Sequence, residues 1–593
     1  MRKLFLYTVV ASIAISCTKT ETTTQLLDGE IVTISASSGV ITKTSLDGTS
    51  VLWSDNDAIK LFTSEGSGFE MKLVDGEGTT LGTFSGTMTS SAAPFYAFYP
   101  SANAVSKENA TVNYTLPQVQ SGASGTFAQA TNPAIAMFST LEDKAVFYNM
   151  QGLVQLTLKG TQTISKLKII SLADEMLWGS VAATINTTKT PDQWPQAISG
   201  GDNEIVLQFT DGLQLSDSGT TVYFVLPAGT LSKGFKLVAY NQSGVPVDEF
   251  FTSSDHSVVQ GAILPMAGIE IGQYNILDAD GTANCYNVVK TNTELPFKFC
   301  AVKGNGFDAV GATGVEEYWE TLATSNAAFN SGNLGYLLEE INLYRNCVTF
   351  KIKGRSGSAL LAAKGSDGQI LWSWHIWITK NLPGASKMTN GVTVMDLNLG
   401  ASEPGTDTSQ PMGFLYQWGR KDPFPAPYHV AYSSLMKFNP EGIMKSEAIS
   451  DANLEYVIKN PSTFIDNNST KWDASGKSVW ADKKTIFDPC PPGYRVPTSA
   501  ELTGLDFGDW DATYCRYTEL GCGYFFPVTS RTYYSSKGVH TTETANTGYY
   551  WTCTHSNGNM AKMVTVSSLK KAALTDLNKS FGLAVRCVAE NSR

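Results

Sequence analysis

The chain has few of the residues that mark catalytic or nucleic-acid-binding sites. No arginine occurs between Arg2 and Arg345, and no cysteine occurs between Cys17 and Cys285. With 43 Lys and Arg against 54 Asp and Glu, the net charge of −11 provides no basic field to attract phosphate, so nucleic acid is not an expected partner. The five histidines have no metal-ligand spacing, and GxSxG, HExxH, P-loop and CxxC motifs are missing. We therefore expect no metal, no cofactor and no enzymatic activity.

The composition indicates several domains of mostly β structure. The chain has 593 residues, of which 42% are hydrophobic and only 16% are charged. At about 150 residues per domain, this length predicts about three or four domains. Short runs rich in Val, Thr, Tyr and Phe alternate with clusters of turn residues, and long helical patterns are scarce. We expect a mostly β fold.

The first residues have the pattern of an export signal. Arg2 and Lys3 precede about a dozen apolar residues, a stretch too short to span a bilayer stably. The following Ala-Ile-Ser-Cys17 resembles the lipobox of bacterial lipoproteins, which implies a signal peptide over residues 1–17 and lipid attached to Cys17. Residues 18–26 are polar and are expected to form a tether. The resemblance implies an outer-membrane lipoprotein held to the membrane through Cys17; the alternative is a soluble secreted protein with a chance cysteine.

Residues 27–272 are predicted to form an antiparallel β-sandwich region, because short apolar runs are separated by Gly, Asn, Asp and Ser. Four motifs in order resemble the fimbrillin-like family of Bacteroidetes lipoproteins, which are similar to type V pilins. They are Lys43-Thr44-Ser45-Leu46 with Trp53-Ser54-Asp55-Asn56-Asp57-Ala58-Ile59, then Tyr96-Ala97-Phe98-Tyr99-Pro100, then Phe147-Tyr148-Asn149-Met150-Gln151-Gly152-Leu153, and Leu226-Pro227-Ala228-Gly229.

This resemblance implies assembly with other pilin subunits by donor-strand exchange. In such pilins a protease removes an N-terminal strand, usually after an arginine, and the opened groove accepts a strand of the next subunit. Here Lys43 stands in place of the arginine. Either a lysine-tolerant protease cuts between Lys43 and Thr44, or the strand over residues 30–41 stays in place and the protein is a monomeric lipoprotein. Lys43 as an ordinary solvated residue is the third alternative.

Residues 276–385 are predicted to form a small β module. Its last run, Trp372-Ser373-Trp374-His375-Ile376-Trp377, resembles a module that accompanies the next segment in Bacteroidetes surface proteins. In a strand, Trp372, Trp374 and Ile376 share one face, and His375 and Trp377 share the other. We expect these rings to pack in a core or between domains; a carbohydrate platform is the alternative.

Residues 388–593 contain the longest motifs of the chain. In order, these resemble the Fibrobacter succinogenes major paralogous domain family. The block from Arg495 to Leu502, which begins in the third motif, also resembles a block of C-type-lectin-like and sulfatase-modifying-factor folds. The resemblance implies an α+β lectin-like domain. Thr498 is predicted to cap a helix over residues 499–505, with Glu501 as its capping-box partner. The motifs are Val394-Met395-Asp396-Leu397-Asn398-Leu399-Gly400-Ala401, Leu415-Tyr416-Gln417-Trp418-Gly419-Arg420-Lys421-Asp422-Pro423-Phe424-Pro425, Asp488-Pro489-Cys490-Pro491-Pro492-Gly493-Tyr494-Arg495-Val496-Pro497-Thr498, Tyr524-Phe525-Phe526-Pro527 and Gly582-Leu583-Ala584-Val585-Arg586-Cys587-Val588.

Eight cysteines lie between residues 285 and 587, an even number that is compatible with disulfides in an exported protein. Cys490 and Cys587 lie at the two ends of the last segment's core, and we expect them to pair across a loop of roughly 100 residues, a closure worth about 4 kcal/mol. Cys515 is a candidate partner of Cys522 or Cys553. An enzyme of the formylglycine-generating fold would instead use reactive cysteines, but these three lie among Tyr, Gly and Thr and lack the cations that activate thiols.

The leading functional hypothesis is a cell-surface adhesin that acts as a fimbrial subunit, with a lectin-like domain that binds an unknown host or bacterial glycan or protein. Because the chain ends directly after the strand that contains Cys587, it has no apolar segment to donate, and a tip position is expected. The alternative is a glycan-binding surface lipoprotein without a role in a pilus. Its candidate ligand-binding residues are exposed aromatics of the last segment, namely Trp418, Phe424, Tyr428, Trp480 and Tyr533.

Overall fold

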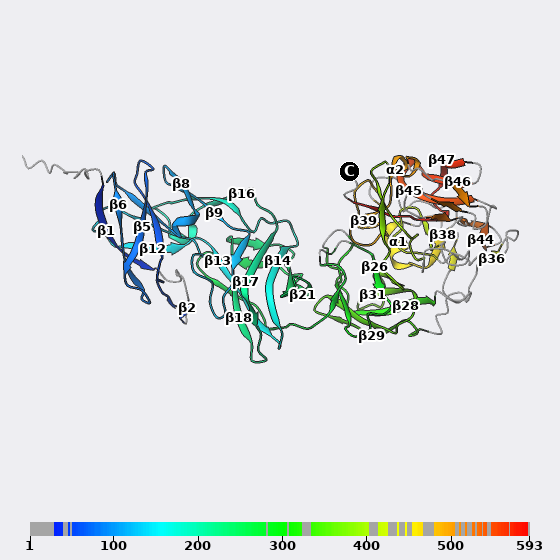
Figure 1. The fold of residues 1–593 in the computed structure, drawn as a ribbon, viewed down its shortest axis with the longest axis horizontal. Helices are drawn as coiled ribbons and strands as arrows, with labels where there is room; N and C mark the ends of the chain where they lie inside the picture. The colour runs from blue at the N-terminus through cyan, green and yellow to red at the C-terminus, as the bar shows by residue number, and fades with distance from the viewer. Residues whose placement is uncertain are drawn as a thin grey trace, which may run out of the picture.

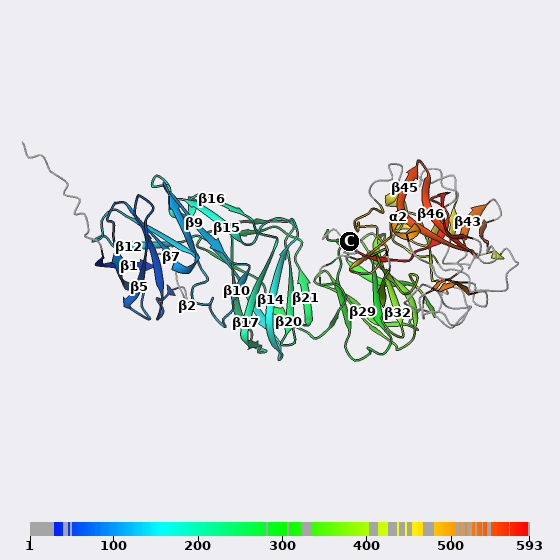
Figure 2. The same ribbon diagram turned by 45° about the horizontal axis from the view of Figure 1, so that its top comes forward.

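The computed structural model has an elongated shape (Figures 1 and 2), with a barrel at one end, a sandwich in the middle, and a compact unit of the small β module and the C-terminal segment at the other. Most described residues lie in strands, which confirms the expected mostly β fold. The structure describes residues 29–38, 46–47, 50–279, 281, 283–304, 308–322, 334–388, 390–401, 413–424, 436–437, 445–447, 453–465, 479–504, 509–511, 516–518, 525–527, 531–535, 538–542, 547–567 and 570–590.

The first sheet closes on itself. Its strands, in spatial order, are β1 (Glu30–Ser38), β12 (Ala145–Asn149), β11 (Ala134–Phe138), β7 (Phe95–Tyr99), β4 (Ala58–Phe62), β5 (Gly68–Asp75) and β6 (Leu81–Met88). The strand expected over residues 30–41 is therefore observed as β1. It alternates as a half-buried strand must, with Val32, Ile34 and Ala36 in the barrel core and Ile31 exposed.

The sequence motifs of this region meet inside the barrel. The Trp53 ring packs edge-on against Tyr99 and Phe147, each with ring centroids 5.7 Å apart. The hydroxyl of Tyr99 donates to Asp57 Oδ1 at 2.9 Å and accepts from the amide of Ala130. Three motifs far apart in the chain thus form one buried cluster with a satisfied polar centre.

A second pair of sheets follows along the long axis. One sheet has the order β10 (Val119–Ser121), β17 (Glu204–Gln214), β14 (Thr163–Ser171), β20 (Phe235–Asn241) and β21 (Pro246–Phe251). The other has β18 (Thr220–Leu226), β13 (Gly152–Lys159) and β23 (Ile263–Pro265), with β24 (Ile269–Glu270) also on β13. Both sheets contribute to one apolar core, so we call this unit the second sandwich. A further sheet, β16 (Gln196–Ser199), β15 (Gly179–Thr184), β9 (Thr111–Leu116) and β8 (Ala104–Glu108), joins it to the barrel.

The small β module is also a pair of sheets. The first has β25 (Asn275–Ile276), β27 (Phe297–Cys300), β30 (Cys347–Ile352) and β29 (Leu338–Tyr344). The second has β26 (Cys285–Val289), β32 (Ile370–Thr379), β31 (Gly357–Lys364) and β28 (Gly314–Leu322). The tryptophan-rich run forms β32.

This run packs in the protein interior, as expected, and is not a carbohydrate platform. Trp374 is buried against Phe299 inside the module, with ring centroids 5.1 Å apart. Trp377 faces the C-terminal segment, where its Nε1 donates to the carbonyl of Ala401 at 2.9 Å. One apolar core extends from the module into the C-terminal segment, so the two pack as one unit.

The C-terminal segment has two main sheets. The first has the order β33 (Ala385–Lys387), β34 (Thr393–Met395), β49 (Val588–Ala589) and β39 (Tyr494–Arg495). The second has the order β36 (Met436–Lys437), β44 (Gly538–Thr542), β43 (Arg531–Ser535), β48 (Gly582–Ala584), β45 (Thr547–Asn557), β46 (Met560–Ser567) and β47 (Lys570–Asn578), and β35 (Leu415–Gln417) also pairs with β48.

The described residues also include two α-helices, α1 (Leu454–Lys459) and α2 (Ser499–Thr503). The predicted capping box of α2 is confirmed, because Thr498 Oγ1 accepts from the Glu501 amide and Glu501 Oε2 accepts from the Thr498 amide. Remaining short strands are β2 (Leu46–Asp47), β3 (Ser50–Val51), β19 (Gly229–Leu231), β22 (His256–Val258), β37 (Lys445–Glu447), β38 (Thr463–Ile465), β40 (Asp509–Asp511), β41 (Arg516–Thr518) and β42 (Phe525–Pro527).

Candidate functional sites at the first strand and at the sandwich junction

Strand β1 closes the barrel, because it lies between β6 and β12 and pairs with both. It pairs antiparallel with β6 from Glu30 opposite Met88 to Ser37 opposite Leu81, and parallel with β12 over three residues. Without β1, both neighbours would have unpaired backbone edges, and the space filled by Ile34 would be open. A groove of this kind can accept another strand by backbone hydrogen bonding and by alternate side-chain pockets.

The residues predicted for lipidation and proteolysis lie outside the described part of the chain. They are Cys17, Lys43 and Thr44. The described end of β1 at Ser38 is five positions before Lys43 in the sequence. A cut after Lys43 would therefore separate β1 from the remainder of the chain.

The hypothesis of exposed ligand-binding aromatics is wrong for three of its five residues. Trp418 and Trp480 are buried, with exposed fractions of 0% and 1%, and their rings contact each other at 5.7 Å between centroids. Trp418 Nε1 donates to the carbonyl of Thr552 at 2.7 Å. Phe424 is also buried and packs against Phe464. All three rings belong to the domain core, so a ligand cannot reach them.

Tyr428 lies outside the described residues. Of Tyr533 the structure describes only the backbone, on β43 opposite His540 of β44. Cys490 and Cys587 form a disulfide, the pairing that was expected, with 6.1 Å between their Cα atoms. Cys553 is a buried free thiol in the structure, and its candidate partner Cys515 lies outside the described part of the chain, as does Cys522.

Charged side chains are buried where the second sandwich meets the small module. Lys298 on β27 forms an ion pair with Asp248 on β21, with Nζ and Oδ1 2.6 Å apart and both side chains 3% exposed or less. Beside it, Lys236 pairs with Glu249 at 2.8 Å. Burial alone would lower the pKa of each lysine, but the adjacent carboxylate more than offsets this, so both pKa values are raised. Both lysines are therefore charged at neutral pH.

The connecting segment lies against the same charges. The amide of Gly272 donates to Asp248 Oδ2 at 2.6 Å, and the amide of Tyr274 donates to the carbonyl of Val247 at 2.9 Å. The ammonium of Lys298 lies over the ring of Tyr274, 4.7 Å from its centroid. These polar contacts lie where the chain passes from the second sandwich to the small module. We call this contact region, around Asp248, Gly272, Tyr274 and Lys298, the junction.

A strained turn contributes the wall of the junction on the module's side. Between β29 and β30, Arg345 and Asn346 have φ values of 47° and 59°, in the left-handed region that costs a residue such as arginine about 1–2 kcal/mol. Arg345 Nη2 donates to the carbonyl of Gly268 at 2.9 Å, and its guanidinium lies 5.5 Å from the centroid of the Tyr344 ring. The turn therefore holds Arg345 across the junction.

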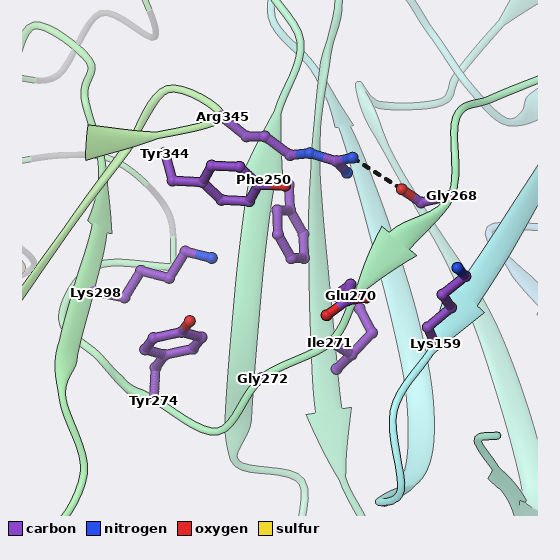
Figure 3. Close-up of a pocket in the computed structure, with 10 residues that line it drawn as sticks. All are labelled: Lys159, Phe250, Gly268, Glu270, Ile271, Gly272, Tyr274, Lys298, Tyr344 and Arg345. Atoms are coloured by element: carbon purple, nitrogen blue, oxygen red, sulfur yellow. Dashed lines mark hydrogen bonds between the residues drawn. The ribbon is translucent and has the colours of Figure 1, made fainter. Parts of the chain in front are cut away.

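A cavity of about 440 Å³ opens at this place (Figure 3). Figure 3 shows Lys298, Tyr274 and Tyr344 on one side and Lys159 with Glu270 on the other. A neighbouring cavity of about 300 Å³ shares Phe250 and Arg345 with the first, and its remaining lining is mostly apolar: Phe235, Leu237, Phe251, Thr252, Met266, Ala267, Ile269 and Asn346. We call the two together the junction pocket. Cations beside tyrosine rings and an apolar pocket can hold an acidic group attached to a ring.

The junction residues were not among the expected site residues, although the sequence contains a signal for them. Lys298 stands between two phenylalanines, Lys236 between Phe and Leu, and Asp248-Glu249 directly before two further phenylalanines. A charge within an apolar strand is rarely buried unless it is paired. Arg345 is also the residue that ends the long arginine-free stretch.

The described residues contain no cluster of three or more His, Cys, Asp or Glu side chains that could hold a metal ion. Among the same residues, no helix has the length and apolar character to cross a membrane.

No family model and no curated protein matches the chain. Among solved structures, similarity is found to a candidate cell adhesion protein from Bacteroides ovatus, with 12% identity, a TM-score of 0.27, and coverage of 41% of this chain and 92% of that one. The tip fimbrial protein Mfa3 from Porphyromonas gingivalis shows 12% identity and a TM-score of 0.19, over 38% of this chain and 81% of that one. A fimbrial protein from Bacteroides ovatus shows 11% identity and a TM-score of 0.19, over 95% of this chain and 99% of that one. These neighbours are adhesion and fimbrial proteins, and scores at this level carry no conclusion about this chain.

Proposed function

We propose that this chain is a cell-surface adhesion protein that enters a fimbria as a subunit, by exchange of the strand at the β1 position. The observation that carries the proposal is the place of β1: a nine-residue N-terminal strand closes the barrel between β6 and β12. The fimbrillin-like motifs around Trp53, Tyr99 and Phe147 add to it, since they build the core that β1 covers. The protein is delivered as an outer-membrane lipoprotein through Cys17, and proteolysis after Lys43 releases it from the lipid.

N-terminal sequencing of protein extracted from the cell surface tests the processing step. A mature chain that starts at Thr44 supports subunit assembly. A blocked N-terminus at Cys17 would mean an intact lipoprotein that keeps β1. A Lys43→Ala variant should stay at the blocked form, and Lys60→Ala, a change on β4 of the barrel, should be processed like the parent chain.

A peptide with the β1 sequence tests strand exchange directly. A chain that starts at Thr44 should bind a synthetic peptide of residues 30–38, detected by fluorescence anisotropy. Ile34→Asp in the peptide should abolish binding, because residue 34 is 1% exposed in the barrel, whereas Ile31→Asp should not, because residue 31 is 74% exposed. Equal binding of the two variant peptides would contradict insertion into the groove.

We place the subunit at the fimbrial tip. The last described strand, β49, is held between β34 and β39 next to the Cys490–Cys587 disulfide, so it is not free to complete the barrel of a neighbour. Immunogold labelling of purified fimbriae should mark one end. Labelling along the shaft would contradict the tip position.

We assign ligand contact to the junction pocket instead of the buried aromatics of the C-terminal segment. The pocket joins Lys159 and Arg345 to the rings of Tyr274 and Tyr344, a combination suited to a sugar acid. Saturation-transfer NMR with glucuronic acid and with glucose as probes tests this. Lys159→Gln should weaken glucuronic acid binding, with Lys60→Gln as control. Equal signals from the two sugars would rule out recognition of the acid group.

A further inference from the structure

Two thiols face each other at the edge of the junction. Cys300 is the last residue of β27, Cys347 is the first residue of β30, and the two are directly opposite in the antiparallel ladder. Their Sγ atoms are 3.1 Å apart. Opposite residues of an antiparallel pair have Cα atoms about 4.5–5.5 Å apart, within the 4.4–6.8 Å that a disulfide spans. Joining the sulfurs therefore needs a closer approach of only about 1 Å.

The other two free thiols among the described residues are Cys285, whose Sγ lies 3.4 Å from Nδ1 of His375, and Cys553, which is also buried. The Cys490–Cys587 disulfide indicates that the chain folds where thiols are oxidised. A facing pair in the same chain meets the same conditions.

We propose that Cys300 and Cys347 form a second disulfide, by exchange with the disulfide of a thiol–disulfide oxidoreductase in the compartment to which the chain is exported. One cysteine loses its proton and attacks a sulfur of the oxidant, which gives a mixed disulfide and one oxidant thiolate. The other cysteine then loses its proton and attacks the sulfur of the first, which releases the second oxidant thiolate. Two electrons pass to the oxidant, and the two protons convert its thiolates to thiols.

The reaction belongs to folding, before the sandwiches dock. In the folded protein both cysteines are buried, 2% and 0% exposed, in a cluster with Leu172 and Phe251 of the second sandwich. Burial is the main cause that raises the pKa of the Cys300 thiol, which makes it a poor nucleophile once docking is complete. The β27–β30 pair forms within the module, where a redox partner can still reach it.

The bond would fix the wall of the junction pocket. Cys347 directly follows the strained turn of Arg345 and Asn346, and the amide of Ala301 donates to the carbonyl of Asn346 at 2.7 Å. A disulfide one residue from the turn anchors it to β27. This inference does not depend on the proposed function, because it is tested on the covalent structure alone.

The experiment is disulfide mapping of the full chain, purified without reductant and denatured in the presence of N-ethylmaleimide. Tryptic cleavage should give residues 299–303 linked to residues 346–351, and residues 485–495 linked to 587–593 as the internal positive control. The peptide with Cys285 should be alkylated. Recovery of Cys300 and Cys347 as alkylated thiols, or linked to other cysteines, would overturn the proposal. In a Cys300→Ala variant the Cys347 peptide should become alkylated, and a Cys347 peptide that remains linked would contradict the pairing.

Discussion

The buried ion pair of Lys298 and Asp248 gives a sharp test of how the second sandwich and the small module are held together. Lys298→Met removes the cation and leaves the Asp248 carboxylate in a site where its side chain is only 1% exposed. Breaking such a pair from one side costs about 3–5 kcal/mol, because a buried charge loses its partner. The amides of Gly272 and Glu249 still donate to Asp248, which favours the lower half of that range.

The chain supplies a matched control at the same junction. Lys233 and Asp308 also join the second sandwich to the module, with Nζ and Oδ1 3.0 Å apart, but their side chains are 61% and 51% exposed. Lys233→Met should therefore cost less than about 1 kcal/mol. Both changes remove one lysine from one junction ion pair, so they differ mainly in burial.

The assay is amide hydrogen exchange combined with urea unfolding. Exchange at Gly272, whose amide donates to Asp248, should become about 10²–10³-fold faster in Lys298→Met if it follows opening of the junction, since each 1.4 kcal/mol is a factor of ten. The double variant Lys298→Met with Asp248→Asn should recover part of the loss in urea unfolding, because no unpaired charge remains and the amide oxygen can still accept from Gly272. If Lys298→Met behaves like Lys233→Met in both measurements, the junction is not held by this pair and the reasoning is refuted.

Three further outcomes are expected. Cys490→Ser opens a disulfide loop with a sequence separation of 97 and should lower the free energy of unfolding of the C-terminal segment by about 4–5 kcal/mol in urea titrations; a loss under about 1 kcal/mol would contradict this. Burial and the neighbouring Glu320 raise the pKa of Glu317 to about 8, so the folded protein keeps a proton that the unfolded chain releases near pH 4.5. The free energy of unfolding should therefore fall as pH rises from 4.5 to 8, by at most about 1.4 kcal/mol per pH unit. Glu317→Gln should flatten this slope. Burial lowers the pKa of His375 to about 3, so stability should fall as pH drops from 6.5 towards 3, and His375→Phe should remove that part of the acid sensitivity in thermal melts.

Local patterns in the sequence were sufficient for several elements. The resemblance to pilins implied a strand over residues 30–41, which is observed as β1, and the Thr498 and Glu501 spacing predicted the capping box of α2. The two-residue period of β32 predicted that its tryptophans pack on both faces, and the structure places Trp374 inside the module and Trp377 against the C-terminal segment. For α2 and β32 the deciding interaction lies within the element or follows from its periodicity.

Tertiary structure decided which aromatics face solvent. Trp418 was expected to be one of the exposed aromatics that bind a ligand, yet it is buried, and the residue that accepts from its Nε1, Thr552, is 134 positions away in the chain. In the same motif Arg420 donates to the carbonyls of Thr463 and Asn460, which completes a buried polar centre. Spacing in the sequence does not report contacts of this range, so the motif could not be assigned to the core in advance.

The same division holds for the sites. The sequence by itself determined the expected compartment through Cys17, the β1 strand before Lys43, and the two cysteines whose disulfide closes the C-terminal segment. Only the tertiary structure decided that β1 closes a barrel, that Lys298 meets Asp248 across two sandwiches, and that Arg345 reaches Gly268. The physical reason is that the periodicity of a strand depends on residues that are neighbours in the sequence. The pairing of charges and the closure of a sheet depend on surfaces that come together only after each unit has folded.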